Sequence, residues 1–234
     1  MTARSHNYTL MPKNTFLNLP DEKRTLIEDV AMQEFAEFGF ANASINRIVA
    51  NAGIAKGSFY QYFANKGDLF QHILARISQE KLAYVTPVLQ SPTQHDFFTL
   101  LQELFRVGLA YAKNNPIAGY VGFEIIKNQN IDELQELFQS YRTSGIEFYK
   151  SLLLQGIARG ELDPDIDLDF VGHMLLELQL ASFNYYFNVI NHGSLDPEDW
   201  GDDFMPIINK MIQFIKNGVQ AQTETLNSTG VLSQ

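Results

Sequence analysis

A group of hydrogen-bonding side chains follows a glycine turn in the N-terminal third of the chain. Lys56, Gly57, Ser58, Tyr60 and Gln61 fall in a short predicted helix, residues 55–63. Small residues let a helix approach a groove of DNA closely, and lysine, hydroxyl and amide groups donate hydrogen bonds to base edges and phosphates. These residue types at this spacing predict a contact with nucleic acid.

The charge distribution supports the same contact, although the chain as a whole is acidic. The 234 residues carry a formal net charge of −10. Residues 1–66 hold seven Lys and Arg against six Asp and Glu, whereas residues 67–234 hold ten against 21. Residues 38–67 contain three basic side chains and no acidic one. Because phosphate binding depends on local positive charge, this window is the part of the chain suited to it.

Two short helices joined by a glycine turn must position these donors. Ser44 is a suitable N-cap for a helix over residues 45–51, and Gly53 can adopt the positive φ of a tight turn before residues 55–63. Phe59 and Phe63, four residues apart, are expected to anchor the second helix. With a preceding helix over residues 21–38, the pattern is a helix-turn-helix unit. An ordinary helical hairpin is the alternative, but the aromatic run and the missing acids favour DNA binding.

The sequence from Arg24 to Leu69 resembles the N-terminal domain of TetR-type transcriptional regulators. Ala55 departs from the family pattern, which often has a hydroxyl residue there. The resemblance implies a homodimer that binds a near-palindromic operator in double-stranded DNA. The features that carry it are Gly39-Phe40, Ser44, the spacing of Ile45 and Ile48, Ala52-Gly53, Lys56-Gly57-Ser58-Phe59-Tyr60, Tyr62-Phe63 and Asn65-Lys66.

The resemblance also assigns DNA contacts by position. Lys66 begins the next predicted helix, where its side chain and the unpaired backbone N–H groups can both hold a phosphate. The resemblance implies base-edge or groove contacts for Lys56, Gly57, Tyr60 and Gln61, and phosphate contacts for Ser44, Ser58, Tyr62 and Lys66.

Helical periodicity continues through the rest of the chain without alternating strand patterns, which predicts an all-α fold. A linking helix from residue 65 to about residue 84 is followed by predicted helices over residues 93–114, 117–127, 131–159, 165–191 and 197–217. We therefore expect a flexible N-terminal arm (residues 1–20), a helix-turn-helix domain (residues 21–66), a larger helical domain for ligand binding and dimerisation (residues 67–218) and a flexible tail (residues 219–234).

The predicted helix over residues 165–191 is apolar on nearly every face. Such a helix must be covered on both sides, which fits a position between its own core and a second subunit. The resemblance implies that the last two long helices supply the homodimer interface. A wholly internal helix in a monomer is the alternative.

The larger predicted domain carries 19 Phe and Tyr residues, enough to line an apolar cavity. The resemblance implies that this domain binds a small-molecule inducer. Each aromatic side chain of this domain also fits ordinary core packing, and His173 also fits a position in the core or at an interface. The ligand candidates are Phe105, Tyr111, Tyr120, Phe123, Phe148 and Tyr149, with His173 as a polar contact.

The sequence gives little support for a metal site, a cofactor site or a catalytic site. The absence of cysteine excludes disulfides, thiolate metal sites and cysteine nucleophiles. Asp163, Asp165, Asp167 and Asp169 alternate like a calcium loop but lack its Gly and Glu, so we expect helix capping instead. No cofactor loop or catalytic triad occurs. We therefore expect no metal, no cofactor and no enzyme activity.

No signal-peptide core and no membrane-spanning stretch are evident, so we expect a cytoplasmic protein without membrane contact. Taken together, the sequence predicts a ligand-responsive DNA-binding regulator, in its simplest form a repressor released by an apolar or aromatic molecule. The alternative is a helical small-molecule-binding or scaffold protein that does not bind DNA.

Overall fold

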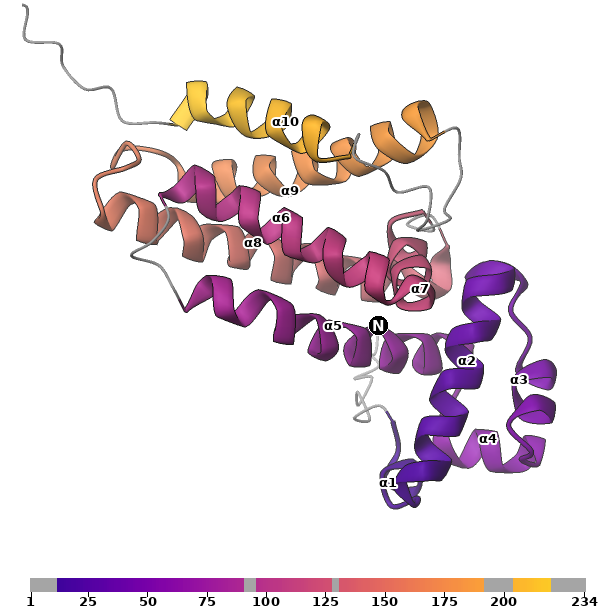
Figure 1. The fold of residues 1–234 in the computed structure, drawn as a ribbon. Helices are drawn as coiled ribbons and strands as arrows, with labels where there is room; N and C mark the ends of the chain where they lie inside the picture. Colours follow the sequence, from indigo (N-terminus) through magenta and orange to yellow (C-terminus); the bar gives the residue numbers. More distant parts are fainter. Residues whose placement is uncertain (1–11, 91–95, 128–130, 192–203, 220–234) are drawn as a thin grey trace, which may run out of the picture.

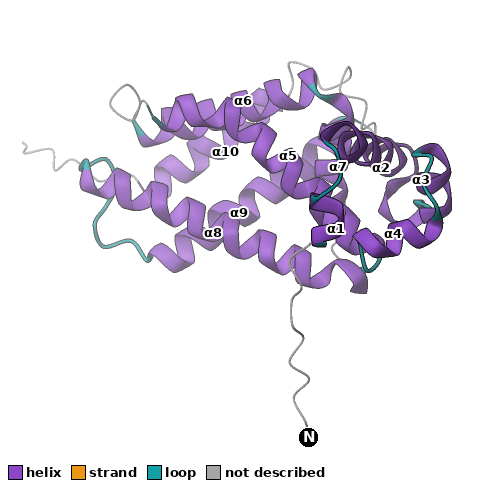
Figure 2. Cartoon of the chain, turned by 90° about the horizontal axis from the view of Figure 1, so that it is seen from below, coloured by secondary structure: helices purple, strands orange, loops and turns teal. Residues whose placement is uncertain are grey.

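The computed structural model describes residues 12–90, 96–127, 131–191 and 204–219, and the regular structure in those residues is helical (Figures 1 and 2). The predicted all-α class is therefore confirmed. The helices are α1 (Asn14–Leu17), α2 (Asp21–Asn42), α3 (Ile45–Asn51), α4 (Lys56–Tyr62), α5 (Lys66–Leu89), α6 (Phe97–Asn114), α7 (Pro116–Lys127), α8 (Gln135–Ala158), α9 (Leu168–Tyr185) and α10 (Phe204–Val219), with a 3₁₀ turn at Asp132–Leu134 and a π-helical turn at Tyr186–Ile190.

The N-terminal helices α2, α3 and α4 and the first turns of α5 pack around a cluster of aromatic rings. Phe35, Phe40, Phe59, Phe63 and Phe70 are fully buried. Phe35 lies edge-on to Phe70 with 4.9 Å between ring centroids, and Phe40 lies 5.0 Å from the same ring. Aromatic pairs in such tilted arrangements contribute beyond the area that they bury. This cluster is the base from which α3 and α4 project (Figure 1).

The expectation of a flexible arm through residue 20 is wrong for its last residues. Residues 1–11 lie outside the described residues, but Asn14–Leu17 form α1, and Phe16 in that helix is fully buried. The Phe16 ring lies 4.9 Å from the ring of Phe63, measured between centroids. A four-residue helix has no stability of its own, so packing against the aromatic cluster orders this segment.

Gly39 interrupts α2, as predicted, with a φ of +68°. Residues 40–42 continue in helical conformation before α3 begins. Leu26 and Phe38, which helical periodicity would place on the buried stripe, are exposed, although α2 packs on α3, α5 and α7. That stripe consists of Ile27, Ala31, Glu34 and Phe35.

The long helix α5 begins at the predicted cap. The Asn65 side chain accepts a hydrogen bond from the N–H of Asp68, and the Asp68 carboxylate accepts one from the N–H of Ala64. These reciprocal bonds satisfy N–H groups at the start of the helix. The helix runs past its predicted end near residue 84 and includes Pro87 in its last turn, where the missing N–H removes one hydrogen bond to the preceding turn.

The remaining helices, α6 to α10, which we call the body, surround a second hydrophobic core. α8 and α9 lie side by side, and α10 packs on α6 and α9 (Figures 1 and 2). Glycines permit the close approach of α8 and α9. A Cβ on Gly145 would lie 3.0 Å from a Leu176 carbon, and one on Gly172 would lie 2.9 Å from Lys150.

The predicted helices of the body are present with shifted ends. The expected helix over residues 131–159 is divided into the 3₁₀ turn and α8, and Asp167 caps α9, which moves its start from residue 165 to 168. Residues 197–203, expected to begin the last helix, lie outside the described residues. Val219, expected in the tail, ends α10, and residues 220–234 are not described.

The apolar side of α10 faces the core of its own subunit, and the expectation that the last two helices form the dimer interface stays a prediction. Most of its large apolar side chains are covered by α6 and α9 within one chain, whereas Phe214 is 68% exposed. The buried residues are Phe204, Ile208, Met211, Ile212 and Ile215.

Carboxylates join the body to the N-terminal helices. The buried carboxylate of Glu124 in α7 accepts a 2.9 Å hydrogen bond from the N–H of Phe40, directly after the break in α2. Glu133 accepts a 3.0 Å hydrogen bond from the N–H of Gly67 at the start of α5. The buried Glu124 carboxylate would be costly without a donor, so its bond fixes the end of α2 against the body, and the exposed Glu133 adds a second contact at the start of α5.

Arg76 of α5 connects α2 with α6. Its guanidinium lies 3.0 Å from Glu28 and 2.9 Å from Asp29, both in α2, and 2.9 Å from Glu80. Glu80 accepts a hydrogen bond from the Tyr111 hydroxyl of α6. Burial and the neighbouring Glu80 carboxylate raise the pKa of Tyr111, so its hydroxyl stays protonated and donates. A chain of polar contacts thus runs from α2 through α5 to the body.

Replacing Gly39 tests the break in α2. Alanine is strained at a φ of +68°, and its Cβ would lie 2.9 Å from a Glu124 carboxylate oxygen. We expect Gly39→Ala to lower the free energy of unfolding by about 1–3 kcal/mol. Gly122→Ala in α7 is the matched control, because nothing lies within 4 Å of its Cβ and the helix favours alanine. Urea denaturation of both variants measures the difference, and equal stability would contradict this account of Gly39.

Replacing Glu28 tests the polar chain by its pH dependence. Burial opposes the charge on Glu28, but the hydrogen bond from His72 and the charge of Arg76 outweigh it and lower the pKa of Glu28. A lowered carboxylate pKa contributes stability at neutral pH that is lost as the pH falls below about 5. We therefore expect Glu28→Gln to melt at a lower temperature than wild type at pH 7, with the gap closing toward pH 3. Glu22 is exposed, so the melting temperature of Glu22→Gln should equal that of wild type at every pH. A difference between Glu28→Gln and wild type that does not change with pH would contradict the stabilising role of the Glu28 charge.

Candidate nucleic-acid interface

α3 and α4 are joined by a turn that requires glycine. Gly53 has a φ of +63°, and the N–H of Ile54 donates back to the Val49 carbonyl at 3.0 Å. This is the glycine-ended C-terminal cap that stops a helix abruptly. The two helices match the predicted ranges 45–51 and 55–63 to within one residue at each end.

α4 is anchored on one side and open on the other. Phe59 and Phe63 are fully buried, as predicted. A Cβ at Gly57 would meet nothing within 4 Å, so the helix surface there allows another molecule to approach closely. The residues predicted to contact bases, Lys56, Gly57, Tyr60 and Gln61, are all exposed, and Ser58, predicted to contact a phosphate, is half-buried.

Ser44 precedes α3 as predicted, but its side chain does not cap that helix. Its backbone N–H donates to the carboxylate of Glu34 at 2.7 Å. The buried Glu34 carboxylate also accepts from the Arg47 guanidinium at 2.8 Å, and that guanidinium lies 4.0 Å from the centroid of the Phe38 ring. This ion pair ties the start of α3 to α2.

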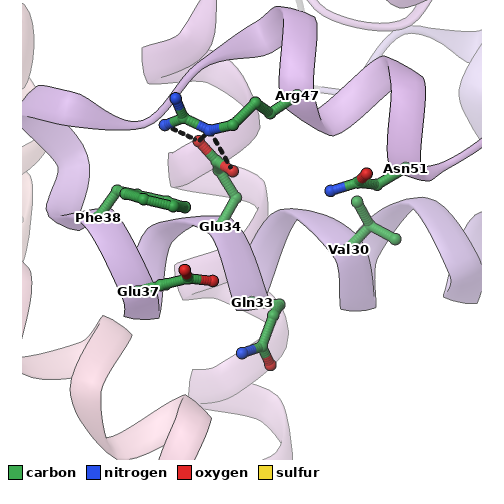
Figure 3. A pocket seen from close by; sticks show the side chains of 7 residues that line it. All are labelled: Val30, Gln33, Glu34, Glu37, Phe38, Arg47 and Asn51. Atoms are coloured by element: carbon green, nitrogen blue, oxygen red, sulfur yellow. Dashed lines mark hydrogen bonds and ion pairs between the residues drawn. The ribbon is translucent and has the colours of Figure 1, made fainter.

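Beside this ion pair, the surface between α2 and α3 has a hollow of about 280 Å³. Figure 3 shows Glu34 and Arg47 pointing toward one another from facing helices at this place. None of the predicted ligand residues lines the hollow. Its lining consists of Val30, Gln33, Glu34, Glu37, Phe38, Arg47 and Asn51.

Lys66 does not fit the predicted phosphate contact of its side chain. Its ammonium donates to the carbonyls of Phe40 at 2.6 Å, Ala41 at 3.2 Å and Ala43 at 3.2 Å. It also lies 4.6 Å from the centroid of the Phe40 ring. All three donors of the ammonium are thereby used at the end of α2. The side chain of Lys66 therefore holds the fold together, and this position can reach DNA only through its backbone.

Tyr62 is likewise more enclosed than predicted. The residue is buried, and its ring lies 5.7 Å from the ring of Phe16 in α1. The sequence pattern alone does not show this, because the covering residue comes from the segment expected to be flexible. Burial gives Tyr62 a packing role and removes it from the exposed contact set.

The predicted ligand residues do not converge on one space. Phe105, Phe123 and Tyr149 are buried in the body core, whereas Tyr111 belongs to the N-terminal core. Tyr120 on α7 is half-buried. Phe148 and His173 are exposed, which corrects their assignment to an enclosed pocket. Aromatic composition predicted an apolar body, but it did not separate core from cavity.

The acidic run before α9 acts as predicted. Asp167 accepts hydrogen bonds from the N–H groups of Asp169 and Phe170, and Asp169 pairs with Lys150 at 2.6 Å. Within the described ranges, no three His, Asp or Glu side chains are grouped to hold a metal ion. The helices in those ranges include none that is both long and apolar enough to cross a membrane.

Sequence reasoning missed two groups that position the exposed face of α4. Glu34 lies on the buried stripe of α2, and an acid in an apolar stripe is a signal for a paired internal charge. Lys13, directly before α1, and Thr15, within α1, hydrogen-bond to the end of α4. Nothing in the spacing of these two residues could have indicated that contact.

Comparisons with known proteins agree with this geometry. A family model described as bacterial regulatory proteins of the tetR family matches residues 27–73, which contain α3, α4 and the start of α5. The transcriptional repressor KstR2 of Mycobacterium tuberculosis is 24% identical over 196 residues, which cover 80% of this chain and 92% of that protein.

Solved structures extend the likeness to the body. A TetR-family regulator from Chloroflexus aurantiacus is 29% identical, with a TM-score of 0.57, over 91% of this chain and 100% of that one. Bacillus subtilis FadR, solved with stearoyl-CoA, shares the fold at 18% identity, with a TM-score of 0.63 over 83% of this chain and 98% of that one. Together with the helix-turn-helix geometry, these matches show that the chain belongs to the TetR family of bacterial transcriptional regulators.

Proposed function

We propose that this protein is a homodimeric repressor that binds a near-palindromic operator and leaves it when a small molecule occupies the body. The observation that carries the proposal is the open side of α4, where Lys56, Tyr60 and Gln61 project from a helix anchored by buried phenylalanines. In a dimer, two such helices about 34–36 Å apart can enter successive major grooves. DNA repels the acidic body, so the open side of α4 is turned toward the DNA. On this proposal the protein works in the cytoplasm.

The proposed dimer interface lies on α8 and α9. Phe170, Met174 and Tyr185 share one side of α9 and are 62%, 38% and 50% exposed. Leu154 of α8 is 52% exposed and lies one turn beyond Lys150, whose partner Asp169 precedes Phe170. An apolar stripe of this kind suits burial against a second copy. The interface expected from the last two long helices shares α9 with this one and has α10 in place of α8.

The proposed effector is an apolar or aromatic molecule bound in the body. Among structural neighbours, FadR was solved with stearoyl-CoA, and KstR2 is described as a ketosteroid regulator. α5 is suited to transmit the effect, because it packs on α6 and is joined to α2 through Arg76. An effector can shift the equilibrium only by the difference in its affinity for the DNA-bound and released forms.

Selection from a randomised DNA pool at two salt concentrations tests the proposal. An enriched palindrome whose binding falls steeply with salt supports a dimeric operator-binding protein. A folded, dimeric protein free of co-purified ligand that enriches no sequence would favour the alternative, a helical ligand-binding protein without DNA binding. Mass spectrometry of the denatured sample establishes whether a ligand is present.

Two substitutions in α4 should separate affinity from selectivity. Lys56→Ala should weaken binding to all sequences and reduce the salt slope by about 1, because it removes one positive charge from the side of α4 that faces the groove. Gln61→Ala should lose discrimination of about 1–3 kcal/mol at particular base pairs. Fluorescence anisotropy on the selected and random duplexes measures both effects. Identical losses on the two duplexes for Gln61→Ala would exclude its role in base reading.

A charge on α9 should dissociate the dimer. Met174→Glu would bury a carboxylate in the proposed interface, and we expect a monomer by analytical ultracentrifugation and loss of operator affinity. Phe214→Glu is the matched control, because Phe214 is 68% exposed on α10, outside the proposed interface. A dimer that survives Met174→Glu and is lost with Phe214→Glu would instead support an interface that includes α10.

A further inference from the structure

The last three carbonyls of α4 are bound by the segment that precedes α2. The Lys13 ammonium donates to the Tyr60 carbonyl at 2.9 Å, and the Lys13 backbone N–H donates to the Tyr62 carbonyl at 3.0 Å. Between them, the Thr15 hydroxyl donates to the Gln61 carbonyl. Three consecutive carbonyls at a helix C-terminus, which have no partner within the helix, are thus satisfied by residues 46 or more positions away in the sequence.

α4 depends on such outside help more than a longer helix would. It has seven residues, and its N-cap is Ala55, which cannot offer a side-chain cap. An isolated helix of two turns is unstable in water, so its geometry must come from its surroundings. A lysine ammonium at the C-terminal end is also favoured by the helix dipole.

The segment that supplies these donors is itself held in place. Arg24 of α2 donates to the Leu17 carbonyl at 2.7 Å and pairs with Asp21. Phe16 fills the space between the rings of Tyr62 and Phe63. α1 is therefore fixed to α2 on one side and to α4 on the other, and it sets the position of the end of α4 relative to α2.

We propose that Lys13, Thr15 and Phe16 form a clamp that positions Tyr60 and Gln61 for base reading. These three are positioning residues, because they act through the backbone that carries the two reading side chains. The inference rests on the proposed reading of DNA by α4. It assigns to the residues ahead of α2 a part in operator selectivity that helix packing in the helix-turn-helix unit does not supply.

The double variant Lys13→Met, Thr15→Val tests the clamp while keeping Phe16 in the core. Losing two hydrogen bonds should weaken binding to the selected operator about tenfold and leave binding to random DNA within about twofold. Hydrogen exchange should quicken in the amides of α4 and stay unchanged in α9. Lys13→Arg with Thr15→Ser retains both donors and should restore selectivity.

Lys23→Met controls for loss of one positive charge, because Lys23 is exposed on α2 and is not one of the residues that bond to the α4 carbonyls. Lys23→Met should weaken binding to the selected operator and to random DNA slightly and by the same factor. The clamp proposal is overturned if the double variant loses the same affinity for the selected operator and for random DNA. It is also overturned if amide hydrogen exchange in α4 is unchanged. If the wild-type protein selects no sequence, the proposed function fails, and the exchange measurement alone decides whether the clamp holds α4.

Discussion

The end of α2 is the point on which the rest of the structure depends. Within five residues the chain breaks at Gly39, donates an N–H to Glu124 of the body and gives three carbonyls to Lys66 of α5. α3 begins directly afterwards, so its direction is set here. Each of these contacts involves the backbone of α2, and a shift of either α5 or α7 must therefore move the start of the helix-turn-helix unit.

Most charged groups near the DNA-binding helices serve structure before they serve DNA. Lys66 caps α2, Arg47 neutralises the buried Glu34, and Arg76 joins two carboxylates of α2 to α5. A basic window in a sequence therefore overstates the charge available to phosphates. Of the three basic residues in residues 38–67, Lys56 alone is exposed with no ion pair or hydrogen bond among the described contacts. The open side of α4 relies mainly on neutral donors, which suits base reading more than general attraction.

The sequence predicted the elements with strong local signals and missed those set by distant contacts. The α3–α4 pair was predictable because Gly53 and the spacing of Phe59 and Phe63 encode it locally. α1 was not, because four residues are too few for periodicity and its order comes from Phe63 and the α4 carbonyls. Lys66 was misassigned for the same reason: its partners lie 23 to 26 residues earlier. The aromatic residues of the body have the same composition in a core as around a cavity, so Phe148 and Phe123 could not be told apart.

The contacts between the body and the DNA-binding helices show how these two parts can influence each other. A contact between two side chains can adjust at both ends by rotation of χ angles, whereas a backbone N–H that donates to a carboxylate can move only with its own helix. Glu124 on Phe40 and Glu133 on Gly67 are contacts of the second kind. They couple the ends of α2 and α5 to the body as rigid units. A displacement of α7 can therefore change the orientation of α3 and α4, which in the proposed dimer alters the spacing of the two recognition helices without unfolding either one.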